Sequence, residues 1–319
     1  MIRPARWWKR LSPARQLQCP HPVKAPHYRF LKGLVNSLSA RVGSKEHPVD
    51  YLLLGTISQD ITQSGERALG GTATFSGCMA HALGMGVGIV AALGPGVDLS
   101  PLEGIAVASQ PSPVSTTYEN RYTPSGRVQY LRQRADRLCF ESVPAHWLAA
   151  PLVHLGPLAD DVDPAVIAHF PAAFIGITAQ GWLRQWDDSG RVSWADWPQA
   201  RQMLPQVDAA VLSIEDVDGD WAYLEKWASW ARVLVVTQAE KGATVYARSE
   251  KRQFPAPSVR VVDPTGAGDL FAGAFFVRYR QSGNPWSAAR FAISLASASV
   301  TRPGLAGLPT RAEIAAAPG

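Results

Sequence analysis

The sequence predicts an α/β fold of three layers, in which helices cover a mostly parallel central sheet. From residue 152 onwards, short apolar runs alternate with helical segments, a pattern typical of βαβ units. A second indication is the stretch 261–276, where a Pro/Gly turn opens directly into an apolar helix. The chain has 319 residues, of which 46% are hydrophobic, so it can bury a large core.

The first 48 residues differ in composition from the rest of the chain. They hold ten Lys/Arg, several prolines and one acidic residue, Glu46, whereas the rest holds 21 basic and 25 acidic residues. The net charge is therefore +9 for the leader and −4 for the body. We predict that 1–48 is a basic, Pro-rich, disordered leader and that 49–319 is the folded domain. A transit peptide and a polyanion-binding arm remain open for the leader, but we favour an upstream translation start or a dispensable tail.

The folded part begins with a buried strand at 49–55, a short apolar run that ends in glycine. Asp60 follows closely, and ligands of open α/β sheets bind beyond the carboxyl ends of the strands. A carboxylate at this place can accept hydrogen bonds from substrate hydroxyls, although a turn aspartate fits it equally. Gly70 and Gly71 precede an Ala/Gly-rich helical stretch. They either let the backbone approach a polyol closely or only form a tight turn.

Further strands are expected in the next hundred residues. Apolar runs at 86–94 and 104–108 predict two of them, and alternating residues at 116–122 and 127–131 predict a β-hairpin around Thr123–Gly126. Its first strand would present Thr117, Glu119 and Arg121 on one face. Arg121 is a candidate substrate contact, and a solvated face is the alternative.

The C-terminal half supplies the remaining strands and helices. Gln180 and Arg184 follow one of its strands, where either could reach the cleft, and we favour an exposed loop for both. The tryptophans of 221–230 recur at helical spacing, which indicates packing rather than base stacking. Strands are predicted at 152–157, 173–177, 209–213 and 233–237, and helices at 162–170, 221–230, 269–281 and 285–299.

The turn at Gly266, Ala267 and Gly268 combines two chemical features at the start of a helix. Glycine leaves the backbone open to a ligand, and a helix N-terminus presents unpaired N–H donors that suit a phosphate or an oxyanion. Asp269 stands beside them, where a carboxylate can take a proton from a substrate hydroxyl. The stretch predicts an anion site next to a base, and a joint with glycines chosen for packing is the alternative.

The string DPTGAGD at 263–269 resembles the signature of the ribokinase-like (phosphofructokinase B type) carbohydrate kinases. This resemblance implies a ribokinase-like fold, an anion hole at Gly266–Gly268 and a catalytic base at Asp269. It extends to the substrate motif formed by Asp60, Gly70 and Gly71. It also implies Mg²⁺ near Asp216, a monovalent cation near Asp263, and ATP contacts from Ser213, Thr237, Gly242, Asp263 and Thr265.

The sequence departs from the family pattern in several places. Phe75 and Ala239 stand where many members have Asn and Gly, and Ser213–Asp216 matches the family's Asn-x-x-Glu loosely. Nine residues separate Asp60 from Gly70, where many members carry roughly twenty or more that form a β lid. The resemblance therefore implies a lid that is shortened or absent, no lid-mediated dimer, and a substrate other than ribose or fructose 6-phosphate. Within the family, these features look most like the myo-inositol kinase branch.

The implied function is ATP-dependent phosphorylation of a hydroxyl on a small sugar, polyol or nucleoside. A ligand-binding or regulatory homologue with weak catalysis is the alternative, since Ser213–Asp216 is altered. There is no P-loop and no paired metal-binding histidine motif, and no apolar run of eighteen residues predicts a membrane helix. Three widely spaced cysteines suggest no disulfide framework. We expect a cytoplasmic protein that binds neither membrane nor nucleic acid.

Overall fold

The computed structural model describes residues 49–318 apart from 63–64 and 124–125. The described residues belong to one unit of the chain, His47–Gly319. The predictions made for the leader at 1–48 lie outside them. None of the helices in this part of the chain is long and apolar enough to cross a membrane.

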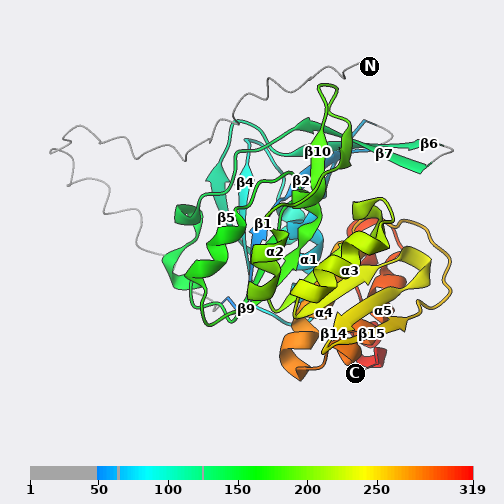
Figure 1. The fold of residues 1–319 in the computed structure, drawn as a ribbon. Helices are drawn as coiled ribbons and strands as arrows, with labels where there is room; N and C mark the ends of the chain where they lie inside the picture. Colours follow the sequence, from blue (N-terminus) through cyan, green and yellow to red (C-terminus); the bar gives the residue numbers. More distant parts are fainter. Residues whose placement is uncertain (1–48, 63–64, 124–125, 319) are drawn as a thin grey trace, which may run out of the picture. The chain divides into compact units, whose positions relative to one another are not determined.

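A nine-stranded sheet lies at the centre of the fold (Figure 1). Its strand order is β15-β14-β13-β12-β9-β8-β1-β4-β5, and the seven strands from β13 to β5 are parallel. The hairpin of β14 and β15 extends one edge in antiparallel fashion. The predicted mostly parallel sheet is confirmed. The strands are β1 (Tyr51–Gly55), β4 (Val87–Leu93), β5 (Ala106–Pro111), β8 (Leu152–Gly156), β9 (Phe174–Thr178), β12 (Ala209–Ser213), β13 (Val233–Thr237), β14 (Ala243–Ala247) and β15 (Glu250–Phe254).

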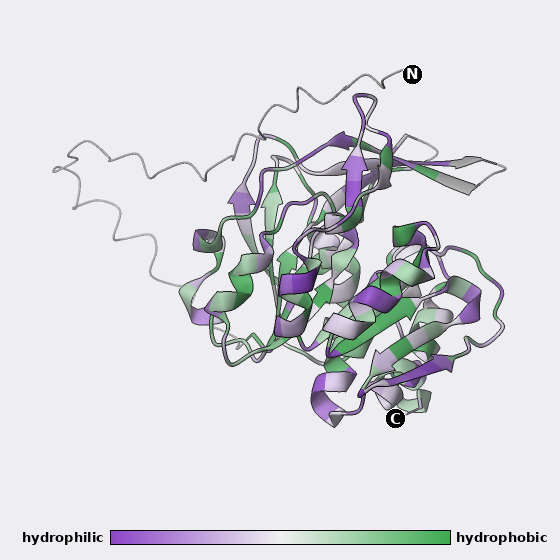
Figure 2. Ribbon diagram, viewed as in Figure 1, coloured by the Kyte–Doolittle hydropathy of each residue, from purple (hydrophilic) through white to green (hydrophobic). Residues whose placement is uncertain are grey.

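Two hydrophobic layers cover the faces of this sheet, and Figure 2 shows how apolar residues concentrate on its strands. One layer holds α1 (Thr72–Ala82), α4 (Ala267–Ser282) and α5 (Pro285–Ser299), with α6 (Arg311–Ala316) packed beside them. The other holds α2 (Ala200–Met203), α3 (Trp221–Trp230) and several short 3₁₀ segments. Trp227 of α3 is 1% exposed and its ring lies 5.6 Å from that of Trp197. The tryptophans of α3 therefore pack against the core, as their spacing predicts.

A second, four-stranded sheet follows β1 and forms a lid with the order β3-β2-β6-β7. It consists of β2 (Ser58–Ile61), β3 (Arg67–Gly70), β6 (Thr117–Thr123) and β7 (Gly126–Gln133). Of the two predicted alternatives, an absent lid is wrong. The short spacing between Asp60 and Gly70 limits β2 and β3 to four residues each, but β6 pairs in parallel with β2 and completes the sheet.

Smaller differences from the predicted elements have local causes. The predicted helix at 162–170 is a 3₁₀ segment, Pro164–His169, capped by the Asp163 side chain. The hairpin of β10 (Arg184–Trp186) and β11 (Val192–Trp194) and the polar edge strand β15 carry little apolar periodicity, so the sequence pattern did not predict them. Cys78 is a buried free thiol.

Candidate active site

Asp269 lies in the first turn of α4 and is held by α1. The Thr72 hydroxyl donates a hydrogen bond of 2.7 Å to its Oδ1, and Ser76 donates one of 2.7 Å to its main-chain oxygen. Burial raises the pKa of Asp269 to about 6, against the lowering effects of the Thr72 hydrogen bond and the charge of Arg184. The charges of Asp216 and Asp60 raise it further. A carboxyl group with a pKa of about 6 is suited to general base chemistry near neutral pH.

The turn before Asp269 has the geometry of an anion site. Gly266 adopts φ 74°, and a Cβ there would lie 2.4 Å from the ring of Phe75, so glycine is required. The N–H of Ala267 donates to the Pro264 carbonyl at 3.2 Å. No hydrogen bond in the described part of the chain takes up the N–H of Gly266 or Gly268, and a Cβ at Gly268 would meet nothing within 4 Å. The backbone is therefore open at Gly268.

Asp263 connects this turn to the C-terminal segment. Its Oδ1 accepts from the Thr265 N–H at 2.9 Å and its Oδ2 from the Gly304 N–H at 2.8 Å. These hydrogen bonds lower the pKa of Asp263, although burial acts in the opposite direction. Asp263 thus holds the turn that contains Thr265 and the loop that contains Gly304 together, and Thr265 contributes its backbone N–H to this contact.

Asp60 of β2 lies close to the glycine pair. Its Oδ1 accepts a hydrogen bond of 3.0 Å from Ser58, and a Cβ at Gly70 would come within 2.4 Å of its Oδ2. Gly71 has φ 89° and is the N-cap of α1, where a Cβ would lie 2.4 Å from the Thr56 carbonyl. The helix that Gly71 caps begins at Thr72, so the glycine pair joins Asp60 to the residue that binds Asp269.

Arg121 is not brought together with these residues. In the parallel pairing of β2 with β6, Asp60 is opposite Tyr118, so the face of Asp60 is shared by Tyr118 and Asn120. Arg121 is on the other face and is exposed, with its Nε 2.5 Å from Glu119 and its guanidinium over the Tyr130 ring. The structure thus places Arg121 in a surface cluster of the lid.

The predicted ATP contacts lie at the ends of two paired strands. Ser213 ends β12 opposite Thr237, which ends β13. Gly242 has φ 87°, and a Cβ there would lie 2.0 Å from the Phe254 carbonyl. Asp216 closes a capping box by accepting from the Ser213 N–H at 2.8 Å, and its other oxygen accepts from Gln180 at 2.7 Å. Since the charge of Asp216 acts on Asp269, this group lies near the base.

Three further residues, Thr72, Asp161 and Arg184, were not among the site residues that we predicted from sequence motifs. Thr72 binds the base, as described above. Asp161 is 4% exposed and accepts hydrogen bonds from the Thr56 hydroxyl and from the N–H groups of Leu158 and Ala159. Arg184 is half-buried rather than in the exposed loop that we expected, with its guanidinium 5.6 Å from the centre of the Tyr118 ring. Only the fold brings Thr72 and Arg184 to Asp269.

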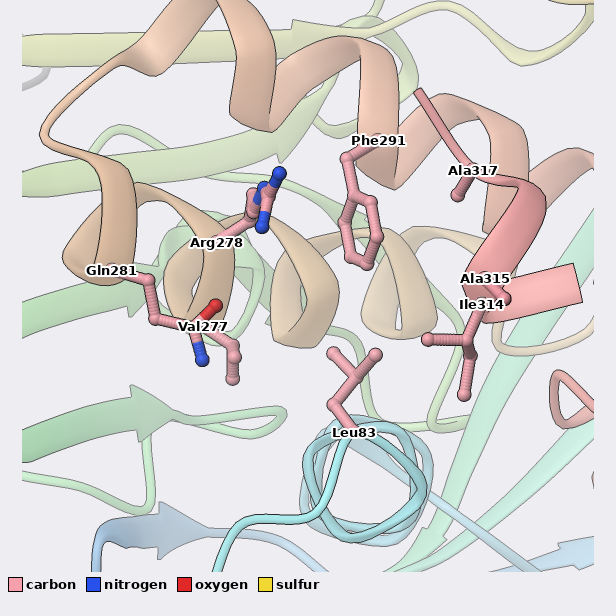
Figure 3. Close-up of a pocket in the computed structure, with 8 residues that line it drawn as sticks. All are labelled: Leu83, Val277, Arg278, Gln281, Phe291, Ile314, Ala315 and Ala317. Atoms are coloured by element: carbon pink, nitrogen blue, oxygen red, sulfur yellow. The ribbon is translucent and has the colours of Figure 1, made fainter. Parts of the chain in front are cut away.

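A separate cavity of about 310 Å³ lies between the end of α1 and helices α4, α5 and α6 (Figure 3). It is lined on α4 by Val277, Arg278 and Gln281, two to three helical turns beyond Asp269. At about 1.5 Å per residue this is roughly 12–18 Å from the base. The cavity is therefore not part of the candidate active site.

Comparison with known proteins identifies similar sequences and folds. The pfkB family carbohydrate kinases match at residues 193–311. Fructokinase-1 of Oryza sativa subsp. japonica is 27% identical over 186 residues, 52% of this chain and 57% of the relative. A cytidine kinase of Thermococcus kodakarensis is 38% identical over 86 residues, 26% of this chain and 28% of the relative. The chain thus matches between 28% and 57% of the length of these two curated relatives.

The solved structures align over nearly their whole length. A pyrophosphate-dependent kinase in the ribokinase family, complexed with a pyrophosphate analogue and myo-inositol, has a TM-score of 0.70 at 21% identity. The alignment covers 83% of this chain and 99% of that one. Ribokinase from Thermotoga maritima has a TM-score of 0.64 at 20% identity, with 84% and 98% covered.

Proposed function

We propose that the chain phosphorylates a hydroxyl of a small sugar, polyol or nucleoside with ATP, which the match of residues 193–311 to the pfkB carbohydrate kinases and the ribokinase-like fold support. The observation that carries this proposal is Asp269, a carboxylate with a pKa of about 6 held beside an open, N–H-lined turn. A base and an anion site in contact are the two parts that phosphoryl transfer to an alcohol requires.

The proposed step begins with proton transfer to Asp269. The acceptor hydroxyl gives its proton to the carboxylate, its oxygen forms a bond to the γ-phosphorus, and the bridging P–O bond breaks. ADP leaves with that electron pair. The N–H groups of Gly266 and Gly268 and the N-terminus of α4 stabilise the charge on the phosphoryl oxygens, and Ala267 shapes the turn. Asp60 and the backbone of Gly70 and Gly71 would orient the acceptor.

The residues at the donor side are compatible with Mg²⁺ that arrives bound to phosphate. The described residues contain no cluster of three or more His, Cys, Asp or Glu that could enclose a metal ion. Mg²⁺ in kinases is commonly held by one or two carboxylates together with substrate phosphates, and Asp216, with the exposed Glu215 beside it, can provide these. The ion would neutralise phosphate charge. Ser213, Thr237 and Gly242 would adjoin the nucleotide.

A coupled assay over polyols, hexoses and nucleosides, with ATP and with pyrophosphate as donors, tests the proposal. Pyrophosphate is included because the structurally similar kinase uses it. Asp269→Asn keeps the size of the side chain and removes the base, so we expect at least 10²-fold lower kcat with the same thermal stability and donor binding. Turnover of the variant at the wild-type rate would refute the role of Asp269.

The alternative is a binding protein of the same fold with little turnover. The hydrogen bonds from the Ser213 N–H and from Gln180, which engage both oxygens of Asp216, favour it, because a carboxylate bound in this way is less available to a metal ion. If no acceptor is phosphorylated with either donor, while one of the same compounds raises the melting temperature, this alternative replaces the kinase.

A further inference from the structure

We propose that Arg184 is a second catalytic residue, whose guanidinium contacts the phosphoryl group during transfer from the side opposite the Gly266–Gly268 turn. The inference rests on the proposed kinase function. It begins from the surroundings of this side chain, which differ from those of the other arginines around the lid.

Arg184 is half-buried, and the groups that it contacts are neutral. Its Nη1 lies 3.4 Å from the Leu158 carbonyl, and its guanidinium lies over Tyr118, whose hydroxyl donates to the same carbonyl at 2.7 Å. No ion pair within 4.0 Å involves Arg184 among the residues that the structure describes. By contrast, Arg132 on the lid binds Glu119 at 2.6 Å.

A half-buried guanidinium without an anion is unfavourable. Arg carries five N–H donors in a fixed fork, and the neutral groups around Arg184 engage only some of them. Removing a charge from water costs free energy that a neutral carbonyl and an aromatic ring offset only in part. The remaining donors of Arg184 are therefore suited to an anionic ligand, and guanidinium matches phosphate oxygens particularly well.

A series of contacts connects Arg184 to the residue that binds Asp269. The Leu158 carbonyl, which Arg184 contacts, belongs to a residue whose side chain approaches Gly71, at 3.2 Å from where a Cβ would be. Gly71 precedes Thr72, which binds Asp269. In agreement with this path, the charge of Arg184 acts on both Asp269 and Tyr118.

The chemistry of the step explains why a cation is useful there. When the acceptor oxygen attacks, it lies within hydrogen-bond distance of Asp269, and the phosphorus is one bond further. Charge spreads over three equatorial phosphoryl oxygens in the transition state. The N–H groups of the turn can reach those on one side only. Arg184 would stabilise the oxygens on the lid side, while the bonds that form and break remain those of the proposed step.

Kinetics of Arg184→Gln and Arg184→Lys test the proposal, with Arg132→Gln as the matched control. We expect kcat to fall by about 10²–10³-fold in Arg184→Gln, with a change of less than about threefold in the acceptor KM. Arg184→Lys keeps the charge and should retain intermediate activity. Added guanidinium ion should partly restore Arg184→Gln. Arg132→Gln should keep the wild-type rate because its charge lies outside the site, bound to Glu119.

An increased acceptor KM with unchanged kcat, or no rescue by guanidinium in a variant that melts like the wild type, would overturn the role. A measurement without turnover separates this from failure of the kinase proposal. Inorganic sulfate, a stand-in for the phosphoryl group, should raise the melting temperature of the wild type more than that of Arg184→Gln, even if no acceptor is found. Equal stabilisation of both proteins would contradict an anion site at Arg184.

Discussion

Thr72 and Asp269 form a pair in which one hydroxyl controls a base. Opposing effects act on the pKa of this carboxyl group: burial raises it, the Thr72 hydrogen bond and the charge of Arg184 lower it, and the charges of Asp216 and Asp60 raise it. The result, a pKa of about 6, leaves most of the carboxylate ionised at neutral pH. The same residue without Thr72 would keep its proton to higher pH.

The pH profile therefore depends on Thr72. Activity of the wild type should fall as pH decreases through about 6, because protonated Asp269 cannot accept a proton. Thr72→Val keeps the shape of the side chain, which is 1% exposed, but removes the donor. A hydrogen bond to a charged group is worth about 1.5–3 kcal/mol, so the acid limb should move up by about one pH unit or more.

The measurement is kcat against pH from 5 to 8.5 for the wild type, Thr72→Val and Thr72→Ser. Serine keeps the hydroxyl, so its acid limb should stay close to that of the wild type. A limb at the same pH in all three proteins would show that the Thr72 hydrogen bond does not set the protonation of the base.

At the scale of elements, the sequence pattern predicted the strands and helices that have a regular hydrophobic period or begin at a characteristic turn. The parallel strands are apolar runs, and α4 begins at the turn that its glycines indicate. Thr72 could not be predicted as a site residue, because it meets Asp269 only where α1 packs beside α4. Arg184 follows β9, and the sequence pattern favoured an exposed loop over a place in the cleft for it. The lid itself was underestimated, because its partner strand β6 is distant in sequence.

In the turn after β13, an alanine replaces a glycine of the family pattern, and its backbone is strained. Ala239, in the place of the family's middle glycine, has φ 49°, which is the left-handed region. This conformation costs a residue with a Cβ about 1–2 kcal/mol, whereas glycine adopts it freely but loses more entropy on folding. Ala239→Gly should therefore stabilise the fold by about 0.5–1 kcal/mol.

Urea unfolding of the wild type and of Ala239→Gly measures this difference. The change should appear in the midpoint and not in the slope. Ser249→Gly serves as a comparison, because Ser249 also has a positive φ, 63°, in the exposed β14–β15 turn. A destabilised Ala239→Gly would mean that the alanine methyl group has contacts worth more than the strain.

At the scale of the whole molecule, a row of hydrogen-bonded polar side chains, Tyr51, His154 and Thr178, crosses the buried parallel sheet; we call it the polar line. His154 of β8 is fully buried between the Tyr51 hydroxyl, 2.7 Å from its Nδ1, and the Thr178 hydroxyl, 3.1 Å from its Nε2. Phe276 of α4 lies against the imidazole. Burial lowers the pKa of His154 to about 3, so the ring stays neutral throughout the range in which an unfolded histidine takes up a proton.

Because His154 stays neutral in the folded protein, the free energy of unfolding depends on pH. Below about pH 6.5 the unfolded chain binds a proton at His154 and the folded chain does not, so stability is present above 6.5 and falls as pH decreases towards 3. Between pH 6.5 and 5 the loss is about 2 kcal/mol. Asp269 acts in the opposite direction, since its raised pKa makes the folded state bind more protons below about 6.

Comparing His154→Gln with the wild type isolates the histidine, because Asp269 contributes equally to both. Glutamine can still form hydrogen bonds but does not titrate, so the variant should be less stable at pH 7.5, owing to imperfect packing, and lose less stability on going to pH 5. The difference between the two losses, from urea unfolding at both pH values, should be about 2 kcal/mol. His81→Gln, at an exposed position, should behave like the wild type. Parallel losses in the wild type and His154→Gln would show that His154 takes up its proton in the folded protein, and that the polar line is accessible to water.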